Sequence, residues 1–198
     1  MSAQHQHIAI LGSGNIGLSL AKGLVKGGIY QPGQIVLTRR NLPALSTLAA
    51  QGYQTTGDNA AAVSRADIVV LAILPQQLNK LLDEIKAAIN PGKHLLISVV
   101  SGVSCHDIRK HLGLDVQIVR AMPNTAIAIG HSMTCIATDN ASAANVELVS
   151  SMFNTVGVSI QINEELMTSA TALCACGIAF FLRSIRAASQ GGTEIGFH

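Results

Sequence analysis

The sequence predicts an α/β fold of the Rossmann type, a doubly wound and mostly parallel sheet followed by a long C-terminal helix. Over the first two thirds of the chain, short apolar runs alternate with amphipathic segments, and glycine, proline or asparagine separates them. This alternation is typical of β-α-β units. A glycine-rich loop follows the first apolar run, and a long uncharged run lies near the C-terminus. We therefore expect a Rossmann domain over residues 1–162 and a helical segment over residues 163–198.

The expected strands are the short apolar runs. They lie at residues 8–11, 34–38, near Tyr53, 67–73, 94–99, 117–121, 132–138 and 158–162. The expected helices between them lie at residues 16–26, 43–50, 76–89, 105–112 and 141–153. The helix at 76–89 shows the clearest pattern, because its leucines and isoleucines recur at intervals of three and four residues, as a helix that lies on a sheet requires. Asn90-Pro91-Gly92 ends it.

The helix at 105–112 begins with a capping box, in which the Ser104 hydroxyl precedes the Asp107 carboxylate by three positions. An alternative function for this segment is a catalytic pair of Cys105 and His106. Adjacent helical residues point about 100° apart and cannot form a nucleophile and base pair. We therefore reject this alternative.

The last helix is expected over residues 163–190, with one apolar stripe. The stripe contains Leu166, Ala170, Leu173, Gly177, Phe181 and Ile185. So short a segment cannot form its own core, so we expect it to dock on the first domain or on a second subunit. Its uncharged part, residues 166–182, is shorter than the roughly 20 apolar residues of a membrane span. A buried helix is therefore the expectation, with no membrane.

Composition narrows the function classes. The chain has 198 residues, which suits one domain with an appendage. Apolar residues make up 48% and charged residues 12%, which excludes a disordered chain and indicates that some apolar surface meets another subunit. The basic residues are scattered and the net charge is only +2, so we expect no nucleic-acid groove. The expected partner is a small molecule.

Four cysteines, Cys105, Cys135, Cys174 and Cys176, show neither zinc-knuckle nor CxxC spacing. We interpret them as reduced core thiols and expect no metal. Residues 1–7 lack a basic region followed by an apolar stretch, so the expected location is the cytoplasm.

The glycine-rich loop is Gly12-Ser13-Gly14-Asn15-Ile16-Gly17, between the first strand and the first helix. In this context the first glycine permits a tight turn, the second lets a pyrophosphate approach the backbone, and the third lets the helix pack on its strand. The unpaired N–H groups and the helix dipole then favour the phosphate charge. The alternative is a glycine-rich turn that binds nothing.

The end of the second strand indicates which dinucleotide binds. An acidic residue there would bind the ribose hydroxyls of NAD, but the segment reads Thr38-Arg39-Arg40-Asn41. Two guanidinium groups suit the 2′-phosphate of NADP. NADP(H) is therefore expected in preference to NAD(H), unless the arginines are ordinary solvated turn residues.

Several segments together resemble the pyrroline-5-carboxylate reductases. They are the glycine loop, Ala66-Asp67-Ile68-Val69-Val70-Leu71-Ala72-Ile73-Leu74-Pro75, Ile97-Ser98-Val99-Val100-Ser101-Gly102-Val103, and the most specific, Arg120-Ala121-Met122-Pro123-Asn124-Thr125. The resemblance implies cofactor contacts at Asn59, Ala72, Ile73, Leu74, Pro75, Val99, Val100 and Ser101. It implies substrate contacts at Met122, Pro123, Asn124, Cys176 and Gly177. The implied reaction reduces 1-pyrroline-5-carboxylate to L-proline with NADP(H), in proline biosynthesis, by a homodimer or higher oligomer.

The sequence departs from the family pattern at two places and stops early. Leu74 stands where the family usually has lysine, and residues 174–180 replace a glycine- and serine-rich stretch. The family continues past residue 198 into helices that supply a threonine to the imine nitrogen, and Thr193 lies in the wrong place for that role. We therefore assign no catalytic residue. The alternative functions are a non-catalytic or regulatory NADP-binding module, or a fragment that needs further C-terminal helices.

A β-hydroxyacid dehydrogenase is the nearest enzymatic competitor. That class normally uses a lysine in its long helix, and residues 163–190 contain none. His131 is the other candidate general acid, and a lone histidine at a strand edge is more typical of solvated surface.

Overall fold

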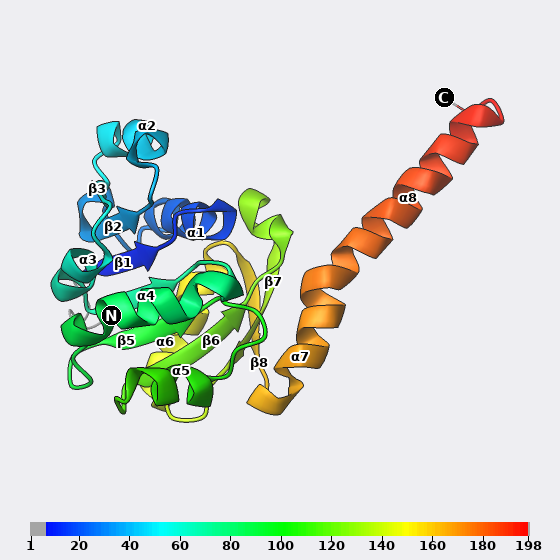
Figure 1. Cartoon of the computed structure of the whole chain (residues 1–198). Helices are drawn as coiled ribbons and strands as arrows, with labels where there is room; N and C mark the ends of the chain where they lie inside the picture. The colour runs from blue at the N-terminus through cyan, green and yellow to red at the C-terminus, as the bar shows by residue number, and fades with distance from the viewer. Residues whose placement is uncertain (1–6, 198) are drawn as a thin grey trace.

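The computed structural model describes residues 7–197 and forms an eight-stranded sheet with helices on both faces (Figure 1). The strands are β1 (Ile8–Leu11), β2 (Ile35–Thr38), β3 (Gln54–Thr56), β4 (Ile68–Leu71), β5 (Leu95–Ser98), β6 (Gln117–Met122), β7 (Ser132–Ala137) and β8 (Gly157–Gln161). Their order is β3-β2-β1-β4-β5-β6-β7-β8, and only β6 and β7 pair antiparallel. The predicted Rossmann-type, mostly parallel sheet is confirmed. Strand order reverses between β1 and β4, where ligands bind in open α/β sheets.

The helices divide between two cores, one on each face. They are α1 (Asn15–Lys26), α2 (Ser46–Ala50), α3 (Asn59–Arg65), α4 (Leu78–Ile85), α5 (Cys105–Leu112) and α6 (Ala143–Asn154). Helices α1, α2 and α6 contribute to the core on one face, and α3, α4 and α5 to the core on the other. Along β1, Ile8 and Ile10 enter the first core while Ala9 and Leu11 enter the second. Burial on both faces explains why the central strands are continuous apolar runs.

Two of the predicted helices show how well the local signals work. The predicted apolar face of α4 is buried, although 3-10 turns at Pro75–Gln77 and Lys86–Ala88 replace the ends of the predicted helix. Ser104 caps α5, because its hydroxyl accepts a hydrogen bond from the Asp107 backbone N–H at 3.1 Å. Helix α3 is missing from the sequence prediction. Its signal was Asp58, whose side chain accepts from the Ala61 backbone N–H.

The C-terminal helix is less regular than predicted. A 3-10 turn (Glu164–Leu166) leads into α7 (Met167–Ala170), a π-helical segment (Thr171–Cys176) and α8 (Gly177–Glu194). Met167 is fully buried beside Met122 and Cys135. Beyond the π-helical segment, α8 leads away from the sheet (Figure 1).

Docking of α8 on the first domain, one of the two expected arrangements, is therefore not observed, and docking on a second subunit stays a prediction. Gly177 is the only residue of α8 that is buried, and most of the predicted stripe faces solvent, with Phe181 68% exposed. The reason is geometric: the first turns of the helix already cover the free face of β7, and the rest extends past its edge. The expectation of core thiols holds for Cys105 and Cys135 but is wrong for Cys176, which is exposed.

The continuous helical stretch Glu164–Glu194 spans 31 residues, and its most apolar window has a mean hydropathy of 1.6. By length and composition it is long enough to cross a membrane, so the expectation that the stretch is too short is wrong. Only 11% of that window is buried. Beyond the turns that pack on the sheet, most of this stretch thus exposes apolar side chains.

Candidate functional site

The glycine loop connects β1 to α1, as predicted, and is fixed by the end of β2. The Ser13 backbone N–H donates to the Thr38 carbonyl at 2.9 Å, and the Gly12 N–H lies 3.3 Å from the Thr38 hydroxyl oxygen. Gly12 has a φ of +93°, and a Cβ there would lie 2.5 Å from the Ala72 carbonyl oxygen. Only glycine fits this turn.

The residues of the loop fit a pyrophosphate. No side chain caps the start of α1 at Gly14, so its first N–H groups remain available to an anion. A Cβ on Gly14 would point into open space, whereas one on Gly17 would lie 2.8 Å from the Gly12 carbonyl oxygen. Ser13 is buried, and its hydroxyl has no hydrogen-bond partner among the described residues. A phosphate oxygen would supply that partner.

The end of β2 brings together the residues expected at the adenosine ribose. Thr38 is buried, and its hydroxyl donates to Asn59 Oδ1 at 2.6 Å. Asn59 comes from the start of α3, so the helix that the sequence analysis missed delivers a residue that the resemblance implied. Arg39 and Arg40 are exposed, and neither forms an ion pair within residues 7–197. Both guanidinium groups are free to meet an anion.

The residues expected to contact the nicotinamide part of the cofactor come directly after β4 and β5 in the chain. Ala72 and Ile73 are half-buried, and Leu74 and Pro75 are exposed. The side chains of Val99 and Val100 are buried in the two cores, which leaves their backbone as the part that can face a ligand, and Ser101 is exposed.

The expected substrate residues meet where β6 ends beside the C-terminal helix. The Asn124 side-chain amide donates to the Cys174 carbonyl at 3.2 Å. Asn124 is itself buried, and its backbone N–H donates to the Ser132 hydroxyl at 3.1 Å. The π-helical segment thus lies against the end of β6, and π-helical turns are frequent at functional sites. Met122 lies in a buried cluster that Cys174 packs against. Pro123 and Gly177 are also buried, and Cys176 is exposed.

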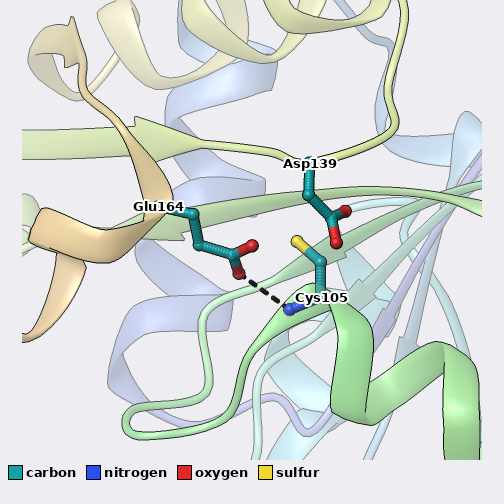
Figure 2. Close-up of side chains that lie close together, drawn as sticks. All are labelled: Cys105, Asp139 and Glu164. Atoms are coloured by element: carbon teal, nitrogen blue, oxygen red, sulfur yellow. Dashed lines mark hydrogen bonds between the residues drawn. The ribbon is translucent and has the colours of Figure 1, made fainter.

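A charged cluster that the sequence analysis did not predict joins the sheet to the C-terminal helix (Figure 2). Glu164, in the turn before α7, accepts from the Cys105 backbone N–H at 2.8 Å and from Arg120 Nη1 at 3.3 Å. Asp139 follows β7 and pairs through both oxygens with Arg109, at 2.5 and 2.6 Å. The Cys105 thiol and both carboxylates lie within 4.8 Å of one another. Each carboxylate has a guanidinium partner, and the bonds of Glu164 to Cys105 and Arg120 fix the turn before α7 to the sheet domain.

The same cluster makes Cys105 unreactive. Burial, together with the nearby Glu164 and Asp139 carboxylates, raises the pKa of the Cys105 thiol to about 12. At pH 8 roughly one thiol in ten thousand is then ionised. We expect iodoacetamide to label the exposed Cys176 in the native protein and Cys105 only after unfolding, as peptide mass spectrometry would measure. Labelling of native Cys105 as fast as Cys176 would contradict this account and reopen the rejected role of Cys105 as a nucleophile.

Comparison with known proteins shows which family the chain belongs to. A protein-family model described as NADP oxidoreductase coenzyme F420-dependent matches residues 7–102. "Pyrroline-5-carboxylate reductase 2" of Dictyostelium discoideum is 46% identical over 210 residues, which cover 98% of this chain and 70% of that protein. The chain belongs to the pyrroline-5-carboxylate reductase family. Proteins of this family are NAD(P)H-dependent oxidoreductases.

Other members of the pyrroline-5-carboxylate reductase family are also similar to this chain, in sequence or in fold. "Pyrroline-5-carboxylate reductase 1" of D. discoideum is 51% identical over 203 residues, 96% of this chain and 37% of that protein. A pyrroline-5-carboxylate reductase structure from Coxiella burnetii has a TM-score of 0.91 and 31% identity over 98% of this chain and 72% of that one. The Plasmodium falciparum enzyme, solved with NADP bound, shares the fold with a TM-score of 0.85 and 23% identity, over 100% of this chain and 72% of that one. This chain thus spans only part of its relatives.

Proposed function

We propose that this chain binds NADP(H) and reduces 1-pyrroline-5-carboxylate to L-proline by hydride transfer to the C=N bond. The observation that supports the proposal is that the glycine loop, with the uncapped start of α1, lies against the end of β2. The relatives of this chain are named for the reaction. The proposed cofactor contacts are Gly12, Ser13, Gly14, Asn15, Ile16, Gly17, Thr38, Arg39, Arg40, Asn59, Ala72, Ile73, Leu74, Pro75, Val99, Val100 and Ser101. The proposed substrate contacts are Met122, Pro123, Asn124, Cys176 and Gly177.

In this proposal the protein binds and orients the reactants. When bound, the nicotinamide supplies the hydride to the imine carbon. The first N–H groups of α1 hold the pyrophosphate, and backbone N–H groups of the segment near Gly177 hold the substrate carboxylate. Asn124 keeps that segment against the sheet through its bond to the Cys174 carbonyl. Such orientation contributes roughly 7–11 kcal/mol to rate enhancement, and an imine that arrives protonated needs no strong acid from the protein.

The direct test is NADPH oxidation with pyrroline-5-carboxylate by this chain and by one extended at its C-terminus. We expect turnover that requires the substrate. Turnover by the longer chain alone would place essential substrate contacts beyond residue 198. NADPH binding without turnover by either would support the alternative of a non-catalytic module, which the departures at Leu74 and residues 174–180 motivate.

The preference for NADP(H) is proposed to come from Arg39 and Arg40. Replacing both by alanine removes two cations that form no ion pair among residues 7–197, so the fold should be unaffected. We expect the Kd for NADPH to rise more than about tenfold, because charge-assisted bonds to the 2′-phosphate are lost. The Kd for NADH should change little. Calorimetry with both cofactors measures this, and equal losses would refute the assignment.

Residues 163–198 are proposed to form a subunit interface, which makes the protein a homodimer or a higher homo-oligomer. The exposed apolar side chains gather on the C-terminal helix, at Leu173, Phe180, Phe181, Leu182 and Ile185. Such a patch drives association in water. We expect light scattering to give at least twice the 20.6 kDa of one chain. A monodisperse monomer at high concentration, or a protein recovered only with lipid or detergent, would contradict the interface.

A further inference from the structure

A chain of hydrogen bonds connects α4 to the glycine loop. Both carboxylate oxygens of Glu84 lie 3.1 Å from Asn59 Nδ2. Asn59 Oδ1 lies 2.6 Å from the Thr38 hydroxyl oxygen, which lies 3.3 Å from the Gly12 backbone nitrogen. The sequence does not indicate this series of hydrogen bonds, because Glu84 is an exposed residue on an amphipathic helix and lies 25 residues from Asn59.

The carboxylate sets the direction of the two bonds that Asn59 forms, whereas the Gly12 N–H can only donate. An ionised carboxylate only accepts hydrogen bonds, so Asn59 must present its NH₂ group to Glu84 and its oxygen to Thr38. The Thr38 hydroxyl then donates to Asn59, and its lone pairs remain for the Gly12 N–H. Without Glu84 the Asn59 amide is free to flip. A flipped amide would donate to Thr38 and turn its oxygen outward.

The orientation matters because Asn59 lies at the proposed cofactor site. Its NH₂ group carries two hydrogens, and the carboxylate of Glu84 needs only one. The other hydrogen is left to donate to an oxygen of the ribose or of its phosphate. A flipped amide would instead offer an oxygen, which repels phosphate oxygens.

We propose that Glu84 is a positioning residue for the dinucleotide, which orients the Asn59 amide toward the ligand and, through Thr38, fixes the turn at Gly12. This inference rests on the proposed function, since it assigns Glu84 a part in binding the same cofactor. Glu84 acts as a hydrogen-bond acceptor. Its negative charge alone would repel a phosphate, so a role through charge predicts the opposite sign.

Three variants separate these roles. Glu84→Ala removes the acceptor, and Glu84→Gln keeps an acceptor oxygen without the charge. Asp83→Ala removes a neighbouring charge from the same helix, where Asp83 pairs with His111 at 2.8 Å and not with Asn59. We expect Glu84→Ala to raise the Kd and the KM for NADPH about fivefold with kcat unchanged, as the loss of one oriented hydrogen bond implies. Glu84→Gln and Asp83→Ala should stay within about twofold of the wild type.

A second measurement needs no cofactor. In nitrogen-15 NMR spectra of the cofactor-free protein, the Gly12 amide resonance should shift in Glu84→Ala and stay in place in Glu84→Gln and Asp83→Ala. Equal NADPH affinity of Glu84→Ala and the wild type would overturn the proposal, as would equal losses in the Ala and Gln variants. If the wild type binds no NADPH, the proposed function fails, and the Gly12 resonance still decides whether Glu84 orients this chain of bonds.

Discussion

Replacing Arg120 by methionine is expected to destabilise the fold by about 3 kcal/mol, the cost of leaving one partner of a buried ion pair without the other. Arg120 and Glu164 have side chains that are only 7% and 17% exposed. After the replacement, the partly buried Glu164 carboxylate has lost its guanidinium partner, while the Cys105 N–H still donates to it. Urea unfolding followed by circular dichroism measures the change. Because Glu164 leads into α7, we also expect faster proteolysis of the C-terminal helix.

Two further variants test the cause of that loss. Arg109→Met breaks the pair with Asp139, whose side chains are 18% and 30% exposed, so it should cost only about 1 kcal/mol. The double variant Arg120→Met with Glu164→Gln leaves no unpaired charge and keeps an acceptor for the Cys105 N–H. It should regain much of the stability lost in Arg120→Met. A double variant no more stable than the single one would mean that Arg120 acts through its packing.

The features that could be predicted from the sequence are those determined by residues close together along the chain. The runs at Ile8–Leu11 and Ile68–Leu71 are apolar throughout because both faces of these strands are buried. The glycine loop could be located because its turn needs glycine at a fixed distance from the strand. The predicted strands match the observed ones to within a few residues, and the predicted helix cap at Ser104 is local as well.

Contacts between distant residues could not be predicted. Glu164 meets Cys105 and Arg120 across 59 and 44 residues of chain, and no periodicity specifies such a pairing. Arg120 did offer a sign, since a charged residue inside a buried strand requires a partner. Nor does an apolar stripe specify what covers it, so the sequence could not tell that α7 docks while α8 extends outward. Helix α3 was missed because its alanines form no stripe, although Asp58 marks its start.

Replacing Gly14 by alanine is expected to abolish tight NADPH binding while leaving the fold intact. Gly14 has a φ of −88°, which alanine adopts without strain, and its Cβ would meet no atom within 4 Å. The loss of stability should stay below about 1 kcal/mol, as for other substitutions at a helix start. The new methyl group would occupy the space proposed for the pyrophosphate. We therefore expect the Kd for NADPH to rise at least about tenfold by calorimetry, with an unchanged circular dichroism spectrum.

Gly12→Ala provides the contrast, because it should fail for a different reason. With a φ of +93° and a backbone oxygen 2.5 Å from its Cβ, alanine at position 12 should cost more than about 3 kcal/mol in the cofactor-free protein. Gly12→Ala is thus expected to lower stability, and Gly14→Ala to weaken NADPH binding, although the two glycines lie only two positions apart. If Gly14→Ala binds NADPH as tightly as the wild type, the pyrophosphate does not lie over the start of α1, and the proposed cofactor site is wrong.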